Sequence, residues 1–237
     1  MAQSKSRAFG AEFFDQTKYR RGQLPAPRTR VAAPFKVRAS PAEVASLPAP
    51  QLRDGAGVWS VLSRDSGGAA EGGRLEQAAL SQLLWACVGF NFGRKRVHVT
   101  AQDVSSLECY VLAFNVQDLF AGVYHYNPRD HSLDQLRMAD VGEPFADCML
   151  APVEIGAQAA AVCFTGVPSR HRVLGGGRAF RYLFLDAGSA AQGLVLAGAA
   201  LGLAATYAVD FYDDELAKLL QVDGRTEVPL CLVTIGS

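Results

Sequence analysis

Apolar residues recur at helical intervals in RLEQAALSQLLWACVGF, residues 74–90. Leu75, Ala79 and Leu83 are four positions apart, which places them on one face of a helix. The segment DDELAKLLQV, residues 213–222, is also amphipathic and begins with acidic residues that suit the positive end of a helix dipole. Both segments are therefore predicted to be helices with one buried face.

Several other apolar segments have the length and the aromatic or aliphatic content of strands. Residues 107–116 and 121–133 are predicted strands, and the second contains the turn residues NPRD after GVYHY. The apolar segments 159–167 and 227–236 are further strand candidates, although the alanines of the first also permit a helix. Loose alternation of helices and strands favours an α+β or α/β sandwich.

The most apolar stretch of the chain, residues 187–206, raises the question of a membrane span. Its length suffices to cross a bilayer, but Gln192 lies inside it and it lacks aromatic belts and flanking basic anchors. Gly198 and Gly202 form a GxxxG pair, a dimerisation face in membranes, whereas small residues in soluble proteins allow close helix packing. We therefore expect a fully buried helix and no membrane partner.

The composition is that of a globular protein. Of the 237 residues 49% are hydrophobic, and 23 Lys and Arg balance 23 Asp and Glu, so nucleic acid is not indicated as a partner. The first forty residues are basic and rich in Pro and Ala, which predicts an extended arm rather than a domain. This arm could meet an acidic partner or be a solvated terminus.

The five cysteines are far apart and lie mostly in apolar runs. No CxxC pair or Cys/His ligand spacing occurs in the sequence, so we expect no structural metal site. Cysteines in such runs are typical of small core residues in a reducing compartment. Because the first ten residues contain no apolar signal region, we expect a cytoplasmic protein.

Familiar catalytic motifs are missing from the sequence: it contains no P-loop, no GxSxG and no HExxH. Cys163 and His171 could form a nucleophile–base pair, but a core cysteine and a loop histidine are the favoured interpretation. Arg64 and Ser66 lie in the glycine-rich SRDSGG, where a guanidinium, a hydroxyl and backbone N–H groups could bind a phosphate. Ordinary exposed loops contain the same residue types.

Several segments, taken together and in order, resemble the SagB-type dehydrogenases, flavin enzymes of the nitroreductase superfamily. The matching residues are LSQLLWA (80–86), LECYVLAFNV (107–116), GVYHYNPRDHSLDQL (122–136), RAFRYLFLDAGSAAQGLVLAGAALGL (178–203), FYDDELAKLLQVDG (211–224) and EVPLCLVTIG (227–236). The resemblance implies an α+β nitroreductase-like fold, with a central, mainly antiparallel sheet flanked by helices. It also implies a homodimer with FMN at the subunit interface. The domain would span residues 56–237, after an N-terminal arm of residues 1–55.

The resemblance further implies which residues contact the cofactor. The early phosphate-binding motif of the family keeps its first Arg and its Ser, here Arg64 and Ser66, which would hold the FMN phosphate. The loop that lies against the flavin keeps Thr100 and Ala101. Gln192, in the long apolar stretch, would be a further contributor to the pocket.

Other positions of the family pattern have changed. The Lys–Tyr pair associated with azoline oxidation is replaced by Leu174 and Gly175, which cannot transfer protons. Ser189 and Gly193 replace a His and an Asn, and Asp103 brings a carboxylate into the flavin loop. No catalytic residue is therefore assigned.

Two functions follow from this pattern. The first is an FMN-linked oxidoreductase that performs a two-electron oxidation of a small or peptide, azoline-type substrate, with the flavin as hydride acceptor. The second is a catalytically degenerate family member that acts as a scaffold or heterodimer partner in a peptide-modifying complex. The partners expected are thus a second copy or a related subunit, and a peptide substrate.

Overall fold

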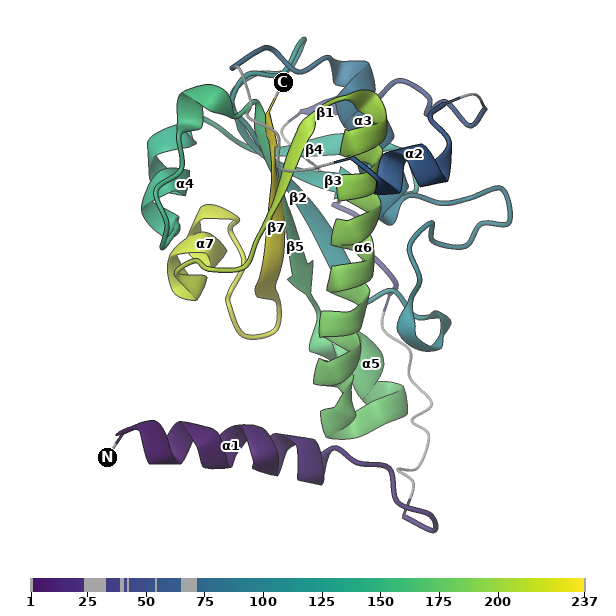
Figure 1. Cartoon of the computed structure of the whole chain (residues 1–237), viewed down its shortest axis with the longest axis vertical. Helices are drawn as coiled ribbons and strands as arrows, with labels where there is room; N and C mark the ends of the chain where they lie inside the picture. Colours follow the sequence, from purple (N-terminus) through teal and green to yellow (C-terminus); the bar gives the residue numbers. More distant parts are fainter. Residues whose placement is uncertain are drawn as a thin grey trace.

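The chain folds around one seven-stranded sheet with the strand order β1-β4-β3-β2-β5-β7-β6. This computed structural model describes residues 2–23, 33–38, 41, 43–53, 55–64 and 72–236, excluding the side chains of 2–8 and 172–176. Every pairing of named strands in the sheet is antiparallel. Helices α3 and α6 cover one face and α4 and α7 the other (Figure 1). The predicted α+β class with a mainly antiparallel sheet is confirmed.

The predicted strands are present with somewhat different limits. The strands are β1 Val44–Ser46, β2 Leu107–Ala113, β3 Gly122–Asn127, β4 Ser132–Met138, β5 Ala160–Gly166, β6 Ala204–Ala208 and β7 Val228–Gly236. The alanine-rich segment 159–167 is strand β5, paired on both sides with β2 and β7. Its residues are fully buried, which explains why it lacks polar alternation.

Both segments predicted to be amphipathic helices are helical, and the structure contains several further helices. The helices are α1 Ala2–Gln16, α2 Val58–Leu62, α3 Gln77–Val88, α4 Gly142–Cys148, α5 Pro168–Gly175, α6 Ala179–Leu201 and α7 Asp213–Leu219. The expected extended arm is wrong for residues 2–16, which form α1. This helix lies at one end of α6 (Figure 1), where Arg181 donates hydrogen bonds to the Phe14 carbonyl and to Thr17.

The long apolar stretch is a helix in its first part only. Helix α6 begins earlier than predicted, at Ala179, and ends at Leu201 because Gly202 adopts a left-handed φ of 75°. The last part of the stretch then becomes strand β6, an element that the sequence prediction missed. By length and composition alone α6 is long and apolar enough to cross a membrane. However, 44% of its apolar 18-residue stretch is buried within the chain. The expected full burial is therefore corrected to a helix buried on one side.

The GxxxG pair has a structural role in this fold. A Cβ at Gly198 would lie 2.7 Å from the Cβ of Ala205 in β6, so glycine permits the close approach of helix and strand. Gly202 supplies the left-handed residue that ends α6. The two glycines thus position β6 against α6, and the motif needs no membrane to explain it.

We expect Gly198→Ala to lower the free energy of unfolding by about 1–3 kcal/mol, because the added methyl overlaps Ala205. The control is Gly10→Ala in helix α1, where an added Cβ also meets no atom within 4 Å. This control should gain about 0.5–1 kcal/mol from helix propensity. Urea denaturation of the two variants measures both effects, and a neutral Gly198→Ala would contradict the packing.

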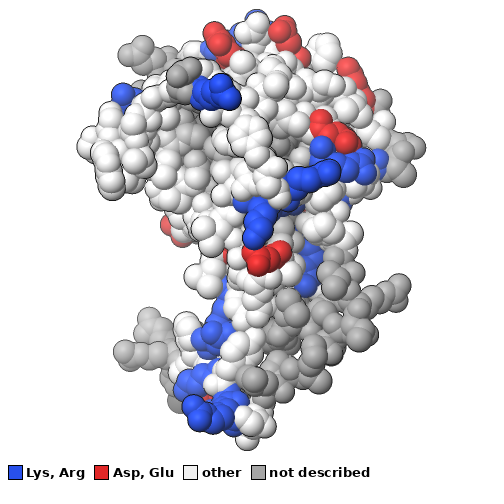
Figure 2. Space-filling view, turned by 90° about the vertical axis from the view of Figure 1, so that its right-hand side faces the viewer, with Lys and Arg blue, Asp and Glu red and all other residues white. Residues whose placement is uncertain are grey.

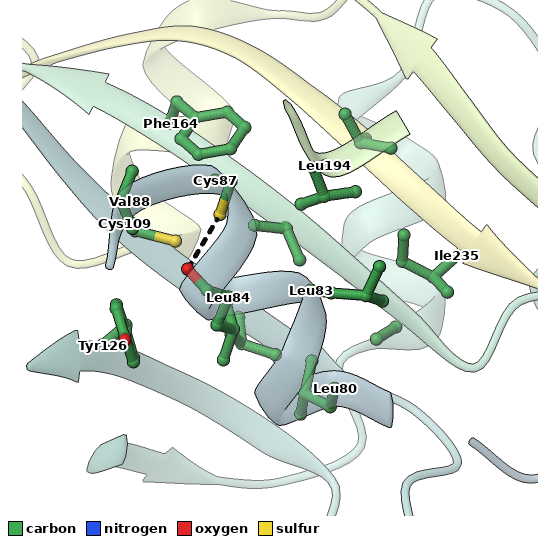
Figure 3. Close-up of a cluster of buried hydrophobic side chains, with 14 of the residues drawn as sticks. Leu80, Leu83, Leu84, Cys87, Val88, Cys109, Tyr126, Phe164, Leu194 and Ile235 are labelled. Atoms are coloured by element: carbon green, nitrogen blue, oxygen red, sulfur yellow. Dashed lines mark hydrogen bonds between the residues drawn. The ribbon is translucent and has the colours of Figure 1, made fainter. Parts of the chain in front are cut away.

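Helix α3 forms the centre of the core on its face of the sheet (Figure 3). Leu80, Leu83 and Leu84 are completely buried and belong to one cluster with Leu194 of α6 and Ile235 of β7. Of the face predicted from the sequence, Leu83 is buried in this cluster, whereas Ala79 is only partly buried and Leu75 precedes the helix. A second cluster lies beneath α4 and α7 on the opposite face.

The five cysteines are buried and free, as the sequence predicts for four of them. Cys87 donates a weak hydrogen bond to the Leu84 carbonyl (Figure 3). Burial raises the pKa of Cys148 and Cys231 to about 11, and that of Cys163 further, which keeps the thiols protonated at neutral pH.

We expect Ellman's reagent to label essentially none of the five thiols in the native protein and all five after denaturation in guanidinium. The physical reason is that the reacting species is the thiolate, which is both rare and inaccessible here. Rapid labelling of one or more thiols without denaturant would show that a cysteine is exposed in solution.

Part of the predicted arm belongs to the sheet. Val44–Ser46 form the edge strand β1, which pairs with Ser132–Asp134 of β4. Further along the chain, Leu47 is buried in the main core cluster. The division at residue 55 stays a prediction, but residues 44–47 contact the body of the protein.

Candidate functional site

Asp186 of α6 anchors the segment that was predicted to face a flavin. Its Oδ1 accepts a hydrogen bond from the backbone N–H of Ala101 at 2.7 Å, and its Oδ2 accepts one from Ser106 Oγ at 2.8 Å. His171 Nε2 lies 3.1 Å from the same Oδ2. The side chains of Asp186, Ser106 and His171 are all buried, so the carboxylate holds the two ends of residues 101–106 against the helix.

His171 corrects a prediction made from the sequence. It lies on helix α5 rather than on a loop, and it contacts Asp186 rather than Cys163. Its ring also packs edge-on against Tyr182, with 5.2 Å between centroids. The favoured interpretation of Cys163 as a core residue is confirmed, because it is buried on β5.

The segment around Thr100 and Ala101 has an unusual backbone. Gln102 and Asp103 both adopt left-handed φ values, 60° and 56°, a conformation that costs non-glycine residues of order 1 kcal/mol each. The contacts of Asp186 and a hydrogen bond from Val99 N to Ser189 Oγ at 3.1 Å hold the strained segment in place. Ser189, which replaces a family histidine, therefore has a positioning role.

Two other predicted cofactor residues, Arg64 and Gln192, lie against or on α6 at other points along the helix. Arg64 donates a hydrogen bond through Nη1 to the carbonyl of Ala199 at 2.8 Å, near the end of the helix. Gln192 is exposed midway along it, and Ser66 lies outside the described residues. At a rise of 1.5 Å per residue, Ala199 is about 20 Å from Asp186 along the axis. One chain alone therefore does not bring Arg64 together with Thr100.

Gly193 explains one departure from the family pattern. A Cβ at this position would lie 3.0 Å from the backbone oxygen of Ala86 in α3. Helices α3 and α6 thus approach each other more closely than an asparagine side chain at position 193 would permit. The absence of the family asparagine is a consequence of helix packing.

Two cavities adjoin the segment that leads from α3 to β2. The first, about 590 Å³, is lined by Pro34, Phe90, Asn91, Arg94, Lys95, Arg96, Val97, His98, Val99, Thr100, Asp103 and Ser105. The second, about 680 Å³, is lined mainly by aromatic and apolar residues and shares Phe90, Asn91 and Arg94 with the first. In Figure 2 basic side chains gather in a band across one face, with acidic side chains beside it.

A separate group of buried charged residues lies at one end of the sheet. Glu108 of β2 accepts hydrogen bonds from His125 Nε2 and from the backbone N–H of Lys36, both at 2.8 Å, and forms an ion pair with Arg170 of α5. Burial alone would raise the pKa of Glu108, but the hydrogen bond from His125 and the charge of Arg170 hold it below its ordinary value.

The second carboxylate of this group is Glu227, immediately before β7. It accepts hydrogen bonds from Tyr110 Oη at 2.8 Å and Thr165 Oγ1 at 2.6 Å, and it is paired with Lys36 Nζ. Burial and the nearby carboxylate raise the pKa of Tyr110 far above its ordinary value. Lys36 therefore ties the segment 33–38 to the sheet through both carboxylates.

Neither Asp186 nor Glu108 was identified from the sequence, although each carries a recognisable signal. Asp186 is the single charge within a long apolar segment, and Glu108 is the single charge within the strand LECYVLA. A lone acid in a buried element needs a partner. Their partners come from distant segments, so the sequence alone does not reveal them.

The antiparallel sheet, the long α6 and the anchored segment before β2 define an α+β protein of the nitroreductase fold. Residues 74–237 match the model of the nitroreductase family, and the chain belongs to this family. It is 30% identical, over 158 residues, to a protein of Methanocaldococcus jannaschii; the match covers 66% of this chain and 78% of that protein.

Solved structures share the fold. A protein of Ralstonia eutropha superposes with a TM-score of 0.70 at 24% identity, covering 90% of this chain and 95% of its own. The Ralstonia protein and the Methanocaldococcus relative are both described as putative nitroreductases. The Escherichia coli microcin synthetase McbBCD complex with truncated pro-MccB17 bound superposes with a TM-score of 0.65 at 19% identity, covering 85% and 84% of the two chains.

Proposed function

We propose that the protein is an FMN-linked oxidoreductase that binds its flavin between two subunits. The observation that carries the proposal is the position of the predicted cofactor residues along α6. Arg64 contacts Ala199 near one end of the helix, whereas Thr100 and Ala101 adjoin Asp186, about 20 Å away. Each of these two points would therefore supply half of the proposed flavin site.

A second copy of the chain would unite the two halves. Gln192 is exposed midway between Asp186 and Ala199, and two antiparallel α6 helices that cross there would place Arg64 of one copy near Thr100 of the other. The exposed side of α6 suits such a contact, because Phe184 is 59% and Leu185 65% exposed. A related subunit could occupy the same face as a heterodimer partner.

The residues present are compatible with the phosphate of FMN. Within the described residues the Arg64 guanidinium donates one hydrogen bond, to the Ala199 carbonyl, so its other N–H groups could contact an anion. The N–H of Ala101 is already bound by Asp186, so Ala101 would contact the flavin through its methyl group. When bound, FMN would supply the hydride-accepting chemistry, while Asp186 and Ser189 would keep the flavin-facing segment in position.

The substrate that we propose is a small molecule or an azoline-containing peptide, as in SagB-type dehydrogenases. The resemblance of the segments and the shared fold with a subunit of a peptide-bound microcin synthetase complex support this assignment. Leu174 and Gly175 offer no proton acceptor at the positions of the family Lys–Tyr pair. The protein would therefore bind and orient its substrate in a cytoplasmic complex without those two groups.

The second candidate is a subunit that completes the site of a related dehydrogenase without catalysing the reaction itself. Asp103 favours it, because an exposed carboxylate on the flavin-facing segment disfavours an anionic cofactor nearby. In that case the chain alone would not bind FMN but would bind a family partner.

The test is an FMN titration of the purified chain, followed by flavin fluorescence and the absorption spectrum. We expect about one FMN per subunit, bleached by dithionite. Arg64→Gln should raise the dissociation constant about 10- to 100-fold through loss of charged hydrogen bonds. Arg53→Gln, another exposed arginine, is the matched control and should change nothing. A colourless chain that takes up no FMN would overturn the first proposal.

The dimer is tested with Leu185→Glu and light scattering after size exclusion. A charge on the exposed side of α6 should produce monomers that no longer bind FMN, because each monomer retains only half of the site. Val209→Glu, which replaces a residue of similar exposure away from α6, should remain dimeric. If Leu185→Glu stayed dimeric with FMN bound, α6 would not be the interface.

A further inference from the structure

The cavity of about 590 Å³ has a strongly basic wall. Arg94, Lys95 and Arg96 line it in succession, and Asp103 is the one carboxylate among its lining residues. Asp103 lies 4.0 Å from Lys95, and both side chains are largely exposed, so this pair neutralises little charge in the interior. The cavity therefore favours an anionic ligand.

Two buried polar side chains, His98 and Ser105, line the same cavity, and His98 makes only a distorted hydrogen bond, with the backbone of Cys87. His98 is 6% and Ser105 5% exposed. Within the described residues, neither nitrogen of the His98 ring nor the hydroxyl of Ser105 makes a hydrogen bond of normal geometry. Leaving buried polar groups unpaired is unfavourable, and such groups are rare in folded proteins. Burial and the charge of Arg96 lower the pKa of His98 to about 4, so its ring is a neutral donor and acceptor at pH 7.

Arg96 adds a cation without a carboxylate partner in the described part of the chain. Its guanidinium donates to the backbone carbonyls of Val88 and Pro34 and lies 4.6 Å from the centroid of the Phe90 ring. Burial lowers its pKa to about 10, which still leaves it charged at neutral pH. The guanidinium thus makes no direct ion pair in the described part of the chain, and the Glu108 carboxylate acts on it only at longer range.

The adjoining cavity gives the ligand an apolar part. Its wall contains the aromatic side chains of Phe35, Trp85, Phe90, Phe92 and Tyr126. Phe92 is 89% exposed, and Arg94 lines both cavities. The two cavities are adjacent, because they share Phe90, Asn91 and Arg94, so one is the basic and the other the aromatic half of a larger candidate site.

We propose that this pair of cavities binds a small amphipathic anion, whose carboxylate or phosphate contacts Arg94, His98 and Ser105 and whose apolar body lies among the aromatic side chains. The site is separate from Arg64, which we assign to the flavin phosphate. Binding follows from the geometry alone, whereas its use as the substrate subsite of the oxidoreductase rests on the proposed function. Thr100 lines the cavity and belongs to the segment predicted to face the flavin, which would link the two.

The experiment measures thermal stability of the flavin-free full chain with inorganic phosphate or benzoate, against sodium chloride of equal ionic strength. We expect either anion to raise the Tm in a saturable manner. A larger shift with benzoate would identify a carboxylate on an aromatic body, and a larger shift with phosphate a phosphorylated ligand. If the Tm depended on concentration in the same way for phosphate, benzoate and chloride, the proposal would be overturned.

Ser105→Ala and His98→Leu distinguish a binding role from a structural one. Each removes a buried polar group that makes no hydrogen bond of normal geometry in the described part of the chain, so the ligand-free Tm should stay the same or rise, while the apparent Kd for the anion rises about 10-fold or more. Arg129→Gln is the control, because Arg129 lines only the aromatic cavity and is exposed; phosphate binding should survive it. If both variants were less stable without ligand and bound the anion as tightly as the wild type, the side chains of Ser105 and His98 would have a structural role.

Addition of FMN separates this proposal from the proposed function. If the site is a distinct one, the phosphate-induced Tm shift persists at saturating FMN, and it also persists in Arg64→Gln. Competition between FMN and inorganic phosphate in the wild type would place the flavin phosphate in this cavity and overturn the assignment of a separate site. A chain that binds the anion but no FMN would keep this inference and refute the flavin proposal.

Discussion

Glu108→Ala is expected to lower the free energy of unfolding by about 3–5 kcal/mol, the usual effect of removing one partner of a buried ion pair. The substitution leaves Arg170, which is 4% exposed, without its carboxylate, and it removes the acceptor of His125 and of the Lys36 N–H. Guanidinium denaturation measures the change. An unaltered m-value would show that the denatured state is unchanged.

Two variants control for this effect. Glu108→Gln keeps the shape and most hydrogen bonds of the side chain and loses only the charge, so its stability should fall between wild type and Glu108→Ala. Glu143→Ala removes an exposed carboxylate from the first turn of α4 and should change stability by about 0.5 kcal/mol or less. Equal losses in all three variants would contradict a specific buried network.

The same carboxylate makes stability depend on pH. Because the folded protein holds the pKa of Glu108 below 4.5, its stabilising effect is complete above that value and is lost as the pH falls through the folded-state pKa. The wild type should therefore lose stability more steeply than Glu108→Gln in acid. Parallel curves below pH 4.5 would contradict the lowered pKa.

Asp186→Ala is expected to cost about 3 kcal/mol or more, because it removes the acceptor of two buried groups, the Ser106 hydroxyl and the His171 ring, and of the partly buried Ala101 N–H. The loss should appear locally as well as globally. Hydrogen exchange at Ala101 should accelerate at least about 100-fold, since its amide donates to the missing carboxylate. Mass-spectrometric exchange of the peptide that spans residues 99–106 measures it.

Asp103→Gly is the matched control in the same segment. Asp103 is exposed and adopts a φ of 56°, so glycine relieves an unfavourable backbone conformation without removing a buried contact. This variant should be as stable as the wild type or more stable. If Asp186→Ala and Asp103→Gly were equally destabilising, the hydrogen bonds of Asp186 would not be what holds residues 101–106 in place.

Elements with strong periodicity could be predicted from the sequence. Helix α3 and strands β2 and β7 appear close to their predicted limits, because each has a long apolar segment bounded by polar or turn residues. The family resemblance carried the prediction further, to a single antiparallel sheet with a long central helix. The missed strand β6 is explained by Gly202, whose left-handed conformation ends α6 within a continuous apolar segment.

The candidate site was much less predictable than the fold. Thr100 and Ala101 were found through resemblance, but their anchor Asp186 and its other partners, Ser106 and His171, converge from three separate segments. His98 and Ser105 have ordinary sequence surroundings, and only their burial without hydrogen bonds of normal geometry in the described part of the chain distinguishes them. Such features depend on the three-dimensional arrangement of the chain.

The position of β7 between β5 and β6 has a consequence for synthesis. Residues 228–236 are synthesised after the other six strands of this sheet, yet they occupy an interior position in it and are the partner of β6. Until then β5 has one open edge, for a time on the order of ten seconds at usual elongation rates. Completion of this sheet is therefore a late step, in which the growing chain is most exposed to strand-edge aggregation and to capture by chaperones.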